Sequence, residues 1–338
     1  MTRLRPGNGR RRLAFAVALS AVLSSSCFGA EFARAFALYF GLQLHSLSPW
    51  SPDGERLLFH PLAGGLWSVP LDGTPPVLLT DDRVNSASFS PDGTQVAYST
   101  TASKEGEQLH HGGLWVVKSD ASGRTQIAIS FESYCLVLGW SLDGKWIACG
   151  AGDGIELVRP DCSERRPLDV YALTAWSPDG EHVARIPKQG SSAIPQIEET
   201  RTRESRPVRL MEGLLPSWSP DGRTLAFADT RVSDPSGTFL MDSDGANRRL
   251  LCEGVLPRWS PSGESILVQR YDRELGFHLV TVAPDGSVEH VLAREASFGY
   301  WSPDGRHVAF WREPDLFVID ADGTNERKVA EPELRAGS

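Results

Sequence analysis

One short motif recurs through the chain and is clearest at Trp218-Ser219-Pro220-Asp221-Gly222. Proline presets φ at about −65°, aspartate hydrogen-bonds its own backbone, and glycine accepts the left-handed conformation that closes a tight turn. The motif therefore predicts a hairpin in which a strand ends at the Trp and Thr224–Phe227 runs back. Seven such copies begin at an aromatic anchor: Trp50, Phe89, Trp140, Trp176, Trp218, Trp259 and Trp301.

The anchors are separated by 39, 51, 36, 42, 41 and 42 residues. A period of about 40 to 45 residues with several short strands per unit predicts a β-propeller. Repeat five gives the clearest four strands, expected at Leu215–Trp218, Thr224–Ala228, Thr238–Asp242 and Arg248–Cys252. Repeat four lacks the second Asp-Gly turn, yet residues 196–203 still predict a strand. We expect an all-β, seven-bladed propeller of four-stranded antiparallel blades, with six blades as the alternative if repeat three or four is degenerate.

The repeat also resembles a known family. The Trp-Ser-Pro-Asp-Gly motif, an aliphatic-Ala-aromatic strand such as Leu225-Ala226-Phe227, the turn Asp242-Ser243-Asp244-Gly245 and a basic-leucine strand resemble the TolB-type β-propeller repeat. That repeat is similar to WD repeats without their Gly-His and Trp-Asp signature. The resemblance covers about residues 46–331. It implies exported, mostly bacterial interaction scaffolds, and it also extends to propellers of prolyl-oligopeptidase-type enzymes, in which a separate hydrolase domain performs the chemistry.

The N-terminal 30 residues are expected to form a signal sequence. Basic residues Arg10–Arg12 precede the apolar segment Leu13–Leu23, which is short for a membrane span. Three outcomes are open: cleavage after Ala35, lipid attachment at Cys27, or retention as an N-terminal anchor. We expect residues 31–46 to be a linker or a strand that latches the ring, 47–331 to form the propeller, and 332–338 to be a tail. The protein is then exported to the periplasm or envelope, touching membrane only through its N-terminal segment.

Charge and cysteine content argue against two classes of function, nucleic-acid binding and cysteine-based metal or redox chemistry. The net charge is −9, and because residues 1–30 hold five Arg and no acid, the remainder carries −14. An acidic body argues against nucleic acid, which requires a clustered basic surface. No Cys-x-x-Cys pair occurs, which argues against zinc-ribbon or redox motifs. Cys135, Cys149, Cys162 and Cys252 leave two possibilities open: a bridge between Cys149 and Cys162, or buried free thiols.

Loop lengths assign a binding face. In a four-stranded meander the first and third turns lie on one face, and here they are short and uniform. The loops between the second and third strands share the other face with the blade-to-blade connections, and they are long and different: Thr100–Gly113, Pro187–Ser192, Asp229–Gly237 and Arg270–Gly276. Variable loops on a rigid scaffold are where binding normally resides. The rim predicted from them comprises Lys104, Glu105, Glu107, His110, His111, Arg231, Asp234, Arg270, Tyr271, Asp272, Arg273, Arg312 and Glu313.

Turn chemistry explains most residues that could suggest catalysis. The repeated Asp (Asp53, Asp92, Asp143, Asp179, Asp221 and Asp304) occupies a turn position in each copy, so it is expected to hold the hairpin. Asp320–Asn325 superficially resembles a calcium loop, but its Gly is fourth instead of sixth. His110-His111 is the one His cluster, and no acid or Cys lies at ligand spacing. The sequence contains no Gly-x-Ser-x-Gly elbow and no phosphate-binding glycine loop.

These observations favour a monomeric ring without cofactor or metal that acts as a non-enzymatic scaffold for protein partners. Two alternatives stay open. One is a propeller enzyme, or a carbohydrate- or small-ligand-binding protein, with a site at the channel mouth. The other is a subunit that works beside a separate peptidase chain.

Overall fold

The computed structural model describes residues 48–329 except 62–63, 101–102, 106–107, 111, 132–134, 142, 152–153, 169, 177, 179–181, 188–195, 200–204, 208–213, 230–236, 275 and 313–314. The segments expected at 1–30, 31–46 and 332–338, with Cys27, lie outside this part. Every regular element of the described residues is a β-strand. Within the same ranges, no helix is long and apolar enough to cross a membrane.

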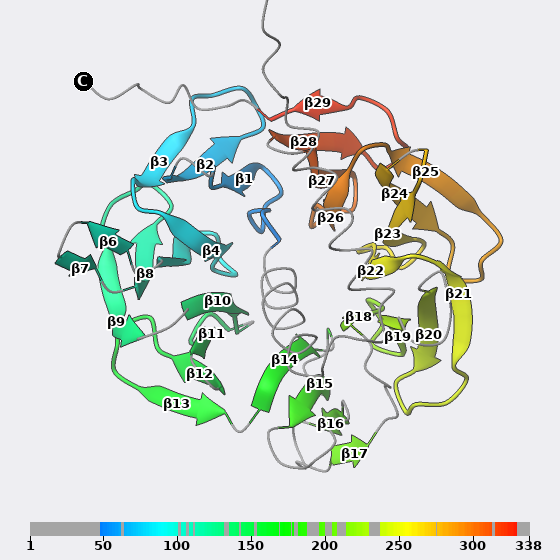
Figure 1. The fold of residues 1–338 in the computed structure, drawn as a ribbon, viewed down its shortest axis with the longest axis horizontal. Helices are drawn as coiled ribbons and strands as arrows, with labels where there is room; N and C mark the ends of the chain where they lie inside the picture. The colour runs from blue at the N-terminus through cyan, green and yellow to red at the C-terminus, as the bar shows by residue number, and fades with distance from the viewer. Residues whose placement is uncertain are drawn as a thin grey trace, which may run out of the picture.

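Seven sheets stand around a ring, each built from strands that follow one another in chain order, and an additional two-stranded sheet is inserted into the second of them (Figure 1). Six are four-stranded and antiparallel, and the first has three strands. The prediction of seven blades is confirmed, and the six-blade alternative is wrong. We name the strands of a blade a to d from the channel outward.

Strands a and b of each blade form the hairpin that the repeated motif predicts. The a strands are β4 (Val84–Phe89), β10 (Cys135–Trp140), β14 (Val170–Trp176), β18 (Leu214–Trp218), β22 (Val255–Trp259) and β26 (Ser297–Trp301). The b strands are β1 (Arg56–Phe59), β5 (Gln95–Thr100), β11 (Ile147–Ala151), β15 (His182–Pro187), β19 (Thr224–Asp229), β23 (Ile266–Asp272) and β27 (His307–Arg312). In blade 1 the a position is reduced to one bridge between Trp50 and Leu57.

Strands c and d complete the blades on the outside of the ring. The c strands are β2 (Leu66–Pro70), β8 (Gly112–Lys118), β12 (Gly154–Val158), β16 (Gln196–Glu199), β20 (Gly237–Asp242), β24 (Gly276–Val282) and β28 (Asp315–Asp320). The d strands are β3 (Val77–Thr80), β9 (Thr125–Phe131), β13 (Arg165–Leu168), β17 (Ser205–Pro207), β21 (Arg249–Glu253), β25 (Glu289–Ala293) and β29 (Arg327–Lys328). The strands of repeat five begin and end within one residue of their predicted bounds. The strand expected at 196–203 is confirmed as the shorter β16.

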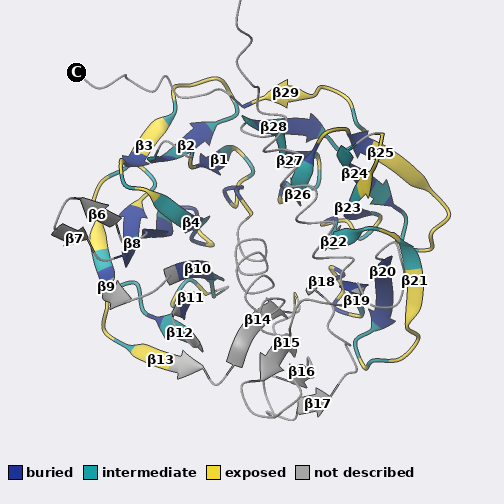
Figure 2. Ribbon diagram, in the orientation of Figure 1, coloured by how far each residue is buried: buried dark blue, intermediate teal, exposed yellow. Residues whose placement is uncertain are grey.

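The core lies between blades. The residue seven positions after the anchor is fully buried in six blades, at Leu57, Val96, Ile147, Leu225, Ile266 and Val308. Burial is concentrated in the b and c strands, while the outer strands β3, β13, β21, β25 and β29 include exposed residues (Figure 2). Each blade thus hides its faces against its neighbours, which is why the repeats form one ring instead of independent units.

Five anchor aromatics pack between neighbouring blades: Trp50, Phe89, Trp140, Trp259 and Trp301. Trp301 packs against Leu267 and Leu279 of blade 6, and its Nε1 donates to the Arg258 carbonyl at 3.1 Å. Trp140 repeats the contact with the Ser88 carbonyl of blade 2, also at 3.1 Å. The acceptor in both cases is the residue immediately before the anchor of the preceding blade. The indole therefore fixes the spacing of two blades through one hydrogen bond and one apolar contact.

The same contact closes the ring. Trp50 Nε1 donates to the Tyr300 carbonyl of blade 7 at 3.0 Å, and the Trp50 ring stacks on His307 at 6.4 Å between centroids. On the outside, Arg327 Nη1 donates to the Leu71 carbonyl of blade 1 at 3.1 Å. The described strands of blade 7 are all C-terminal, β26 to β29. Side chains, and not a shared sheet of described strands, therefore join the two ends of the propeller.

Candidate functional site

The face that carries the a–b and c–d turns is occupied by its own hydrogen bonds. In the hairpin of blade 5, Ser219 Oγ donates to Asp221 Oδ1 at 2.6 Å, and the same oxygen accepts the Arg223 N–H at 3.1 Å. Gly222 N donates to the Ser219 carbonyl at 2.9 Å, with φ at +70°. In blade 6, where Ser262 replaces Asp, its Oγ takes the same place 3.1 Å from Ser260 Oγ.

These hydrogen bonds set the charge of the turn carboxylates. The pKa of Asp143 falls to about 2, first because Ser141 donates to its carboxylate and second because the Lys145 backbone N–H does. The pKa values of Asp92 and Asp221 are lowered by the same pair of donors, Ser first. Carboxylates that stay ionised and fully engaged in a turn are poorly suited to proton transfer. These contacts support the interpretation that the repeated Asp holds the hairpin turn.

The segment that resembles a calcium loop is engaged in the same way. Asp322 Oδ1 accepts the Thr324 N–H at 2.9 Å. Asp320 Oδ1 lies 2.8 Å from His307 Nδ1, and Asp320 Oδ2 accepts from Asn325 Nδ2 at 2.6 Å. In the part of the chain that the structure describes, no group of three or more His, Cys, Asp or Glu residues could hold a metal ion.

The cysteines are free where they can be followed. Cys149 lies buried on β11, whereas Cys162 is exposed at the c–d turn of blade 3. Cys162 Sγ contacts the Gln126 carbonyl of the neighbouring blade at 3.6 Å. The possible Cys149–Cys162 bridge is therefore wrong, and the expectation of buried free thiols holds for Cys149 but not for Cys162.

The opposite face receives the b–c loops and the d–a connections. Lys104 and Glu105 lie on β6 (Ser103–Glu105) and His110 on β7 (Gln108–His110), a two-stranded hairpin inserted between β5 and β8. Glu107, His111, Arg231, Asp234 and Glu313 lie outside the described residues. The structure describes the other five predicted rim residues, which are Arg270, Tyr271, Asp272, Arg273 and Arg312. Two of them form contacts between blades, and three lie at the tip of a hairpin.

Two of the five are held inside the propeller. Arg270 Nε donates to the Glu253 carbonyl at 2.7 Å, and its Nη atoms form a bidentate pair with Glu289. Arg312 repeats this pattern in blade 7: Nη2 donates to the Arg294 carbonyl at 2.8 Å, and the guanidinium pairs with both oxygens of Glu326. Burial lowers the pKa of Arg270, but the hydrogen bonds and charges of Glu289 and Cys252 together outweigh burial, and the net pKa rises. Both arginines join blades instead of facing a partner.

The other three form the tip of a hairpin. The sequence suggested a loop at Arg270–Gly276, but strand pairing continues to Tyr271↔Phe277 and Asp272↔Gly276. This expectation was wrong because Gly276, at φ +66°, allows a tight turn where a wider loop was expected. Asp272 Oδ1 accepts the Glu274 N–H at 2.6 Å and so supports the turn.

An aromatic pair stands at this tip. The Tyr271 and Phe277 rings are 5.1 Å apart between centroids and tilted by 59°. Tyr271 is 49% exposed, the largest exposure of any aromatic side chain among the exposed hydrophobics described. Arg273 and Glu274 are exposed beside it. Aromatic and arginine side chains are enriched in protein interfaces, so this tip has the composition of a contact surface. We call Tyr271, Arg273, Glu274 and Phe277 the blade-6 tip.

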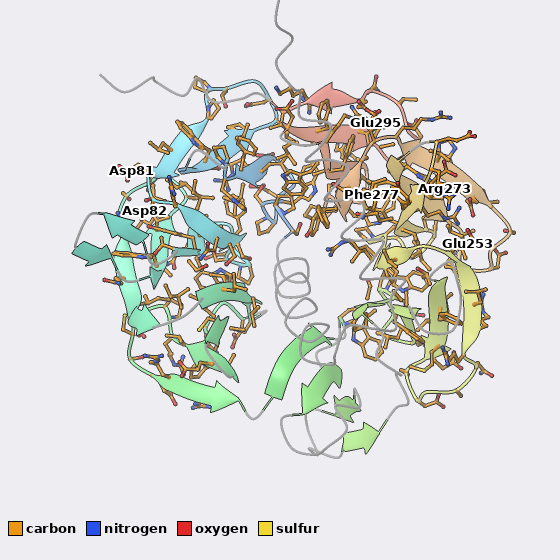
Figure 3. All side chains as sticks on the ribbon, in the orientation of Figure 1. Asp81, Asp82, Glu253, Arg273, Phe277 and Glu295 are labelled. Carbon is orange, nitrogen blue, oxygen red and sulfur yellow. The ribbon has the colours of Figure 1, made fainter. Side chains whose placement is uncertain are left out.

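Residues of the d–a connections join this face and were missed in the sequence. Figure 3 shows Glu253, Arg273, Phe277 and Glu295 on one side of the ring, and Asp81 and Asp82 on the other. Asp82 is engaged, because it pairs with Arg124 and accepts from Thr80 Oγ1 at 3.0 Å. The signal was available: the rule that assigned b–c loops to this face assigns d–a connections to it as well.

Comparisons with known proteins identify the fold. No protein-family model matches the sequence, and no curated protein matches it. Solved structures do match. An oligogalacturonate lyase in complex with manganese superposes with a TM-score of 0.58 at 14% identity, covering 84% of this chain and 86% of that one. The GH74 enzyme of Niastella koreensis superposes with a TM-score of 0.60 at 9% identity, covering 85% of this chain and 54% of that one. At these identities the likeness shows the β-propeller fold alone.

TolB structures are also among the matches. TolB from Acinetobacter baumannii matches with a TM-score of 0.49 at 16% identity. The match covers 69% of this chain, which spans about 62% of the length of that TolB chain. The fold assignment rests on the two superpositions with higher TM-scores.

Proposed function

We propose that this protein is a non-enzymatic propeller scaffold that binds a protein partner through the face bearing the b–c loops and d–a connections. The blade-6 tip is the observation that carries the proposal. It exposes Tyr271, which packs against the partly buried Phe277, and an exposed aromatic that is ordered without its partner loses little conformational freedom on binding.

The internal engagement of the other face supports this choice. The turn Ser donates to the turn Asp in the hairpins of blades 1, 2, 3, 5 and 7, and Ser262 takes the place of Asp in blade 6, so these groups are used by the turns themselves. The TolB-type resemblance of the repeats adds export to the proposal, with the periplasm or envelope as the place where a partner is met.

Differential capture from an envelope extract tests the proposal. The full chain, its Tyr271→Ala variant and a matched Val288→Ala variant are immobilised, and bound proteins are quantified by mass spectrometry. Val288 is 62% exposed near the c–d turn of blade 6, so its truncation removes exposed apolar surface from the opposite face. We expect a protein captured by wild type and Val288→Ala and reduced about tenfold by Tyr271→Ala, which corresponds to about 1.4 kcal/mol. Equal capture by all three would refute the assignment.

A second candidate is a small-ligand or carbohydrate site, catalytic or not, at the channel mouth. It is favoured by Asn85 on the inner strand β4, whose buried Nδ2 has no hydrogen-bond partner in the described structure. Buried polar groups without partners are rare and are candidates for ligand contacts. A thermal-shift screen against soluble oligosaccharides supports this alternative if one ligand stabilises wild type and not Asn85→Ala; stabilisation of both, or of neither, counts against it.

A further inference from the structure

Inside the propeller, one arrangement of side chains recurs, in which an arginine lies over a cross-strand aromatic pair. Four cross-strand aromatic pairs join strands b and c in the described structure, and three have an arginine over a ring. Arg124 lies 4.1 Å from the Trp115 ring of the Tyr98–Trp115 pair. Arg248 lies 4.5 Å from the Phe239 ring of the Phe227–Phe239 pair, and Arg312 lies 4.6 Å from the Phe317 ring of the Phe310–Phe317 pair.

A carboxylate completes the arrangement in two of these cases. Arg124 pairs with Asp82, and Arg312 pairs with Glu326. A guanidinium held flat on an aromatic ring is attracted by the ring quadrupole, while its edge donates to the carboxylate. The arginine is thus bound on its face and on its edge at once, an arrangement that the compact ammonium of lysine reproduces less well.

The fourth pair, Tyr271–Phe277 of the blade-6 tip, differs from the others. No arginine of the described residues lies over either ring, and Tyr271 is half exposed. One carboxylate is nevertheless close, because Glu274 is exposed on the same turn. Glu253 ends β21, and its carbonyl is bound to Arg270, which neighbours Tyr271 on β23 and therefore faces the opposite side of the sheet. The Glu274 carboxylate has no side-chain partner among the described residues.

We propose that the blade-6 tip binds an arginine side chain from a basic segment of the partner protein. Tyr271 supplies the ring face and Glu274 supplies the acceptor, the same combination of ring and carboxylate that holds Arg124 and Arg312 inside blades 2 and 7. The net charge of −9 favours a basic partner over an acidic one. Arg270 does not oppose the guanidinium, because Glu289 neutralises it. Arg273 does oppose it and limits the affinity of the site.

This inference rests on the proposed function, and a peptide titration separates the two. The probes are two labelled hexapeptides that carry three arginines or three lysines at the same positions, titrated against the full chain by fluorescence anisotropy. Their equal charge cancels the general attraction to an acidic protein. We expect the arginine peptide to bind about threefold more tightly than the lysine peptide, in line with one exposed cation–π contact. Arg273→Gln should tighten the arginine peptide about twofold.

The variants decide the outcome. Tyr271→Ala should bring the two peptides to equal affinity, while the matched Val288→Ala keeps the threefold preference. A preference that is absent from wild type, or that survives Tyr271→Ala, overturns the inference. If the preference is absent while Tyr271→Ala still prevents partner capture, the scaffold function stands and only the arginine partner is wrong. If capture is also independent of Tyr271, both proposals fail.

Discussion

The two faces of the ring carry the same kinds of side chain, but on one face these groups bond within the turns and on the other they are exposed to solvent. On the face of the a–b and c–d turns, Asp221 Oδ1 accepts from Ser219 and from the Arg223 backbone, so this oxygen is used by the turn itself. On the opposite face, Glu274 and Tyr271 extend from a short hairpin into solvent. Regularity in the sequence thus marks groups that satisfy one another. Departure from the repeat marks the groups that remain available.

Blades 6 and 7 give the same contrast at the level of one aromatic pair, although Arg270 of blade 6 forms the same internal contacts as Arg312. Arg312 in blade 7 lies over Phe310 and Phe317 and is held by Glu326, whereas the Tyr271–Phe277 pair in blade 6 has no arginine over it among the described residues. Substitutions can test which side chains hold the fold together and which are exposed for binding.

The largest effect should come from the ring closure. Trp50→Ala removes the hydrogen bond to the Tyr300 carbonyl and the packing of the indole against blade 7. We expect the free energy of unfolding to fall by about 3–5 kcal/mol, as for a buried Trp truncation. Urea denaturation followed by Trp fluorescence and by far-UV circular dichroism measures it. A loss below about 1 kcal/mol would mean that the two ends of the chain are held together by other contacts.

Arg312→Ala should have the next largest effect. It leaves Glu326 without its bidentate partner and exposes Phe310 and Phe317, so we expect a loss of about 1–2 kcal/mol of stability. The same denaturation assay measures it, with Arg306→Ala as the control. Arg306 is 81% exposed and its weaker contact to Asp304 is 3.7 Å, so its loss should lie within about 0.5 kcal/mol. Similar losses for the two variants would remove the distinction between internal and surface arginines.

Acid should lower the free energy of unfolding, because it protonates a turn carboxylate. The pKa of Asp143 is about 2 in the folded protein and 3.8 in its ordinary state, so ionised Asp143 stabilises the fold at neutral pH. Because the folded pKa is the lower one, this contribution is present above about pH 4 and is lost as the pH falls toward 2. Asp143→Ser copies Ser262 of blade 6, and its stability deficit relative to wild type should shrink over that window. A deficit that is constant from pH 6 to pH 2 would contradict the assignment.

The smallest effect on stability belongs to Tyr271→Ala. An aromatic that is half exposed at a hairpin tip contributes little to the fold, and we expect a change within about 0.5 kcal/mol by the same urea assay. A loss near that of Arg312→Ala would show that the tip is part of the core and would undermine its proposed role in binding.

The repeats allowed the fold to be predicted because each turn is determined locally. Proline, aspartate and glycine in Ser-Pro-Asp-Gly specify the hairpin without reference to the remainder of the chain, and the anchor spacing then specifies the number of blades. The rim was predicted less well. Nothing next to Arg270 or Arg312 in sequence reveals that Glu289 and Glu326 engage them, because those pairs form across the blade.

The hairpin tip shows the same limit. Residues 270–276 contain charged groups that are typical of a loop, and only the pairing of Tyr271 with Phe277 shows that the strands continue. The channel also depends on long-range packing: the buried amide of Asn85 on β4 has no local signature. Turn chemistry can be deduced from neighbours in sequence, whereas side-chain partnerships between strands require the assembled ring.

We propose that the blade-6 tip binds the partner while the repeated elements hold the ring together. Stability and partner capture, measured together for Tyr271→Ala and Arg312→Ala, separate these two roles. We expect opposite patterns: Tyr271→Ala keeps the wild-type unfolding midpoint and loses capture about tenfold, and Arg312→Ala loses about 1–2 kcal/mol of stability while its folded fraction captures the partner as wild type does. Capture that follows stability in both variants, or that survives Tyr271→Ala, would contradict the claim.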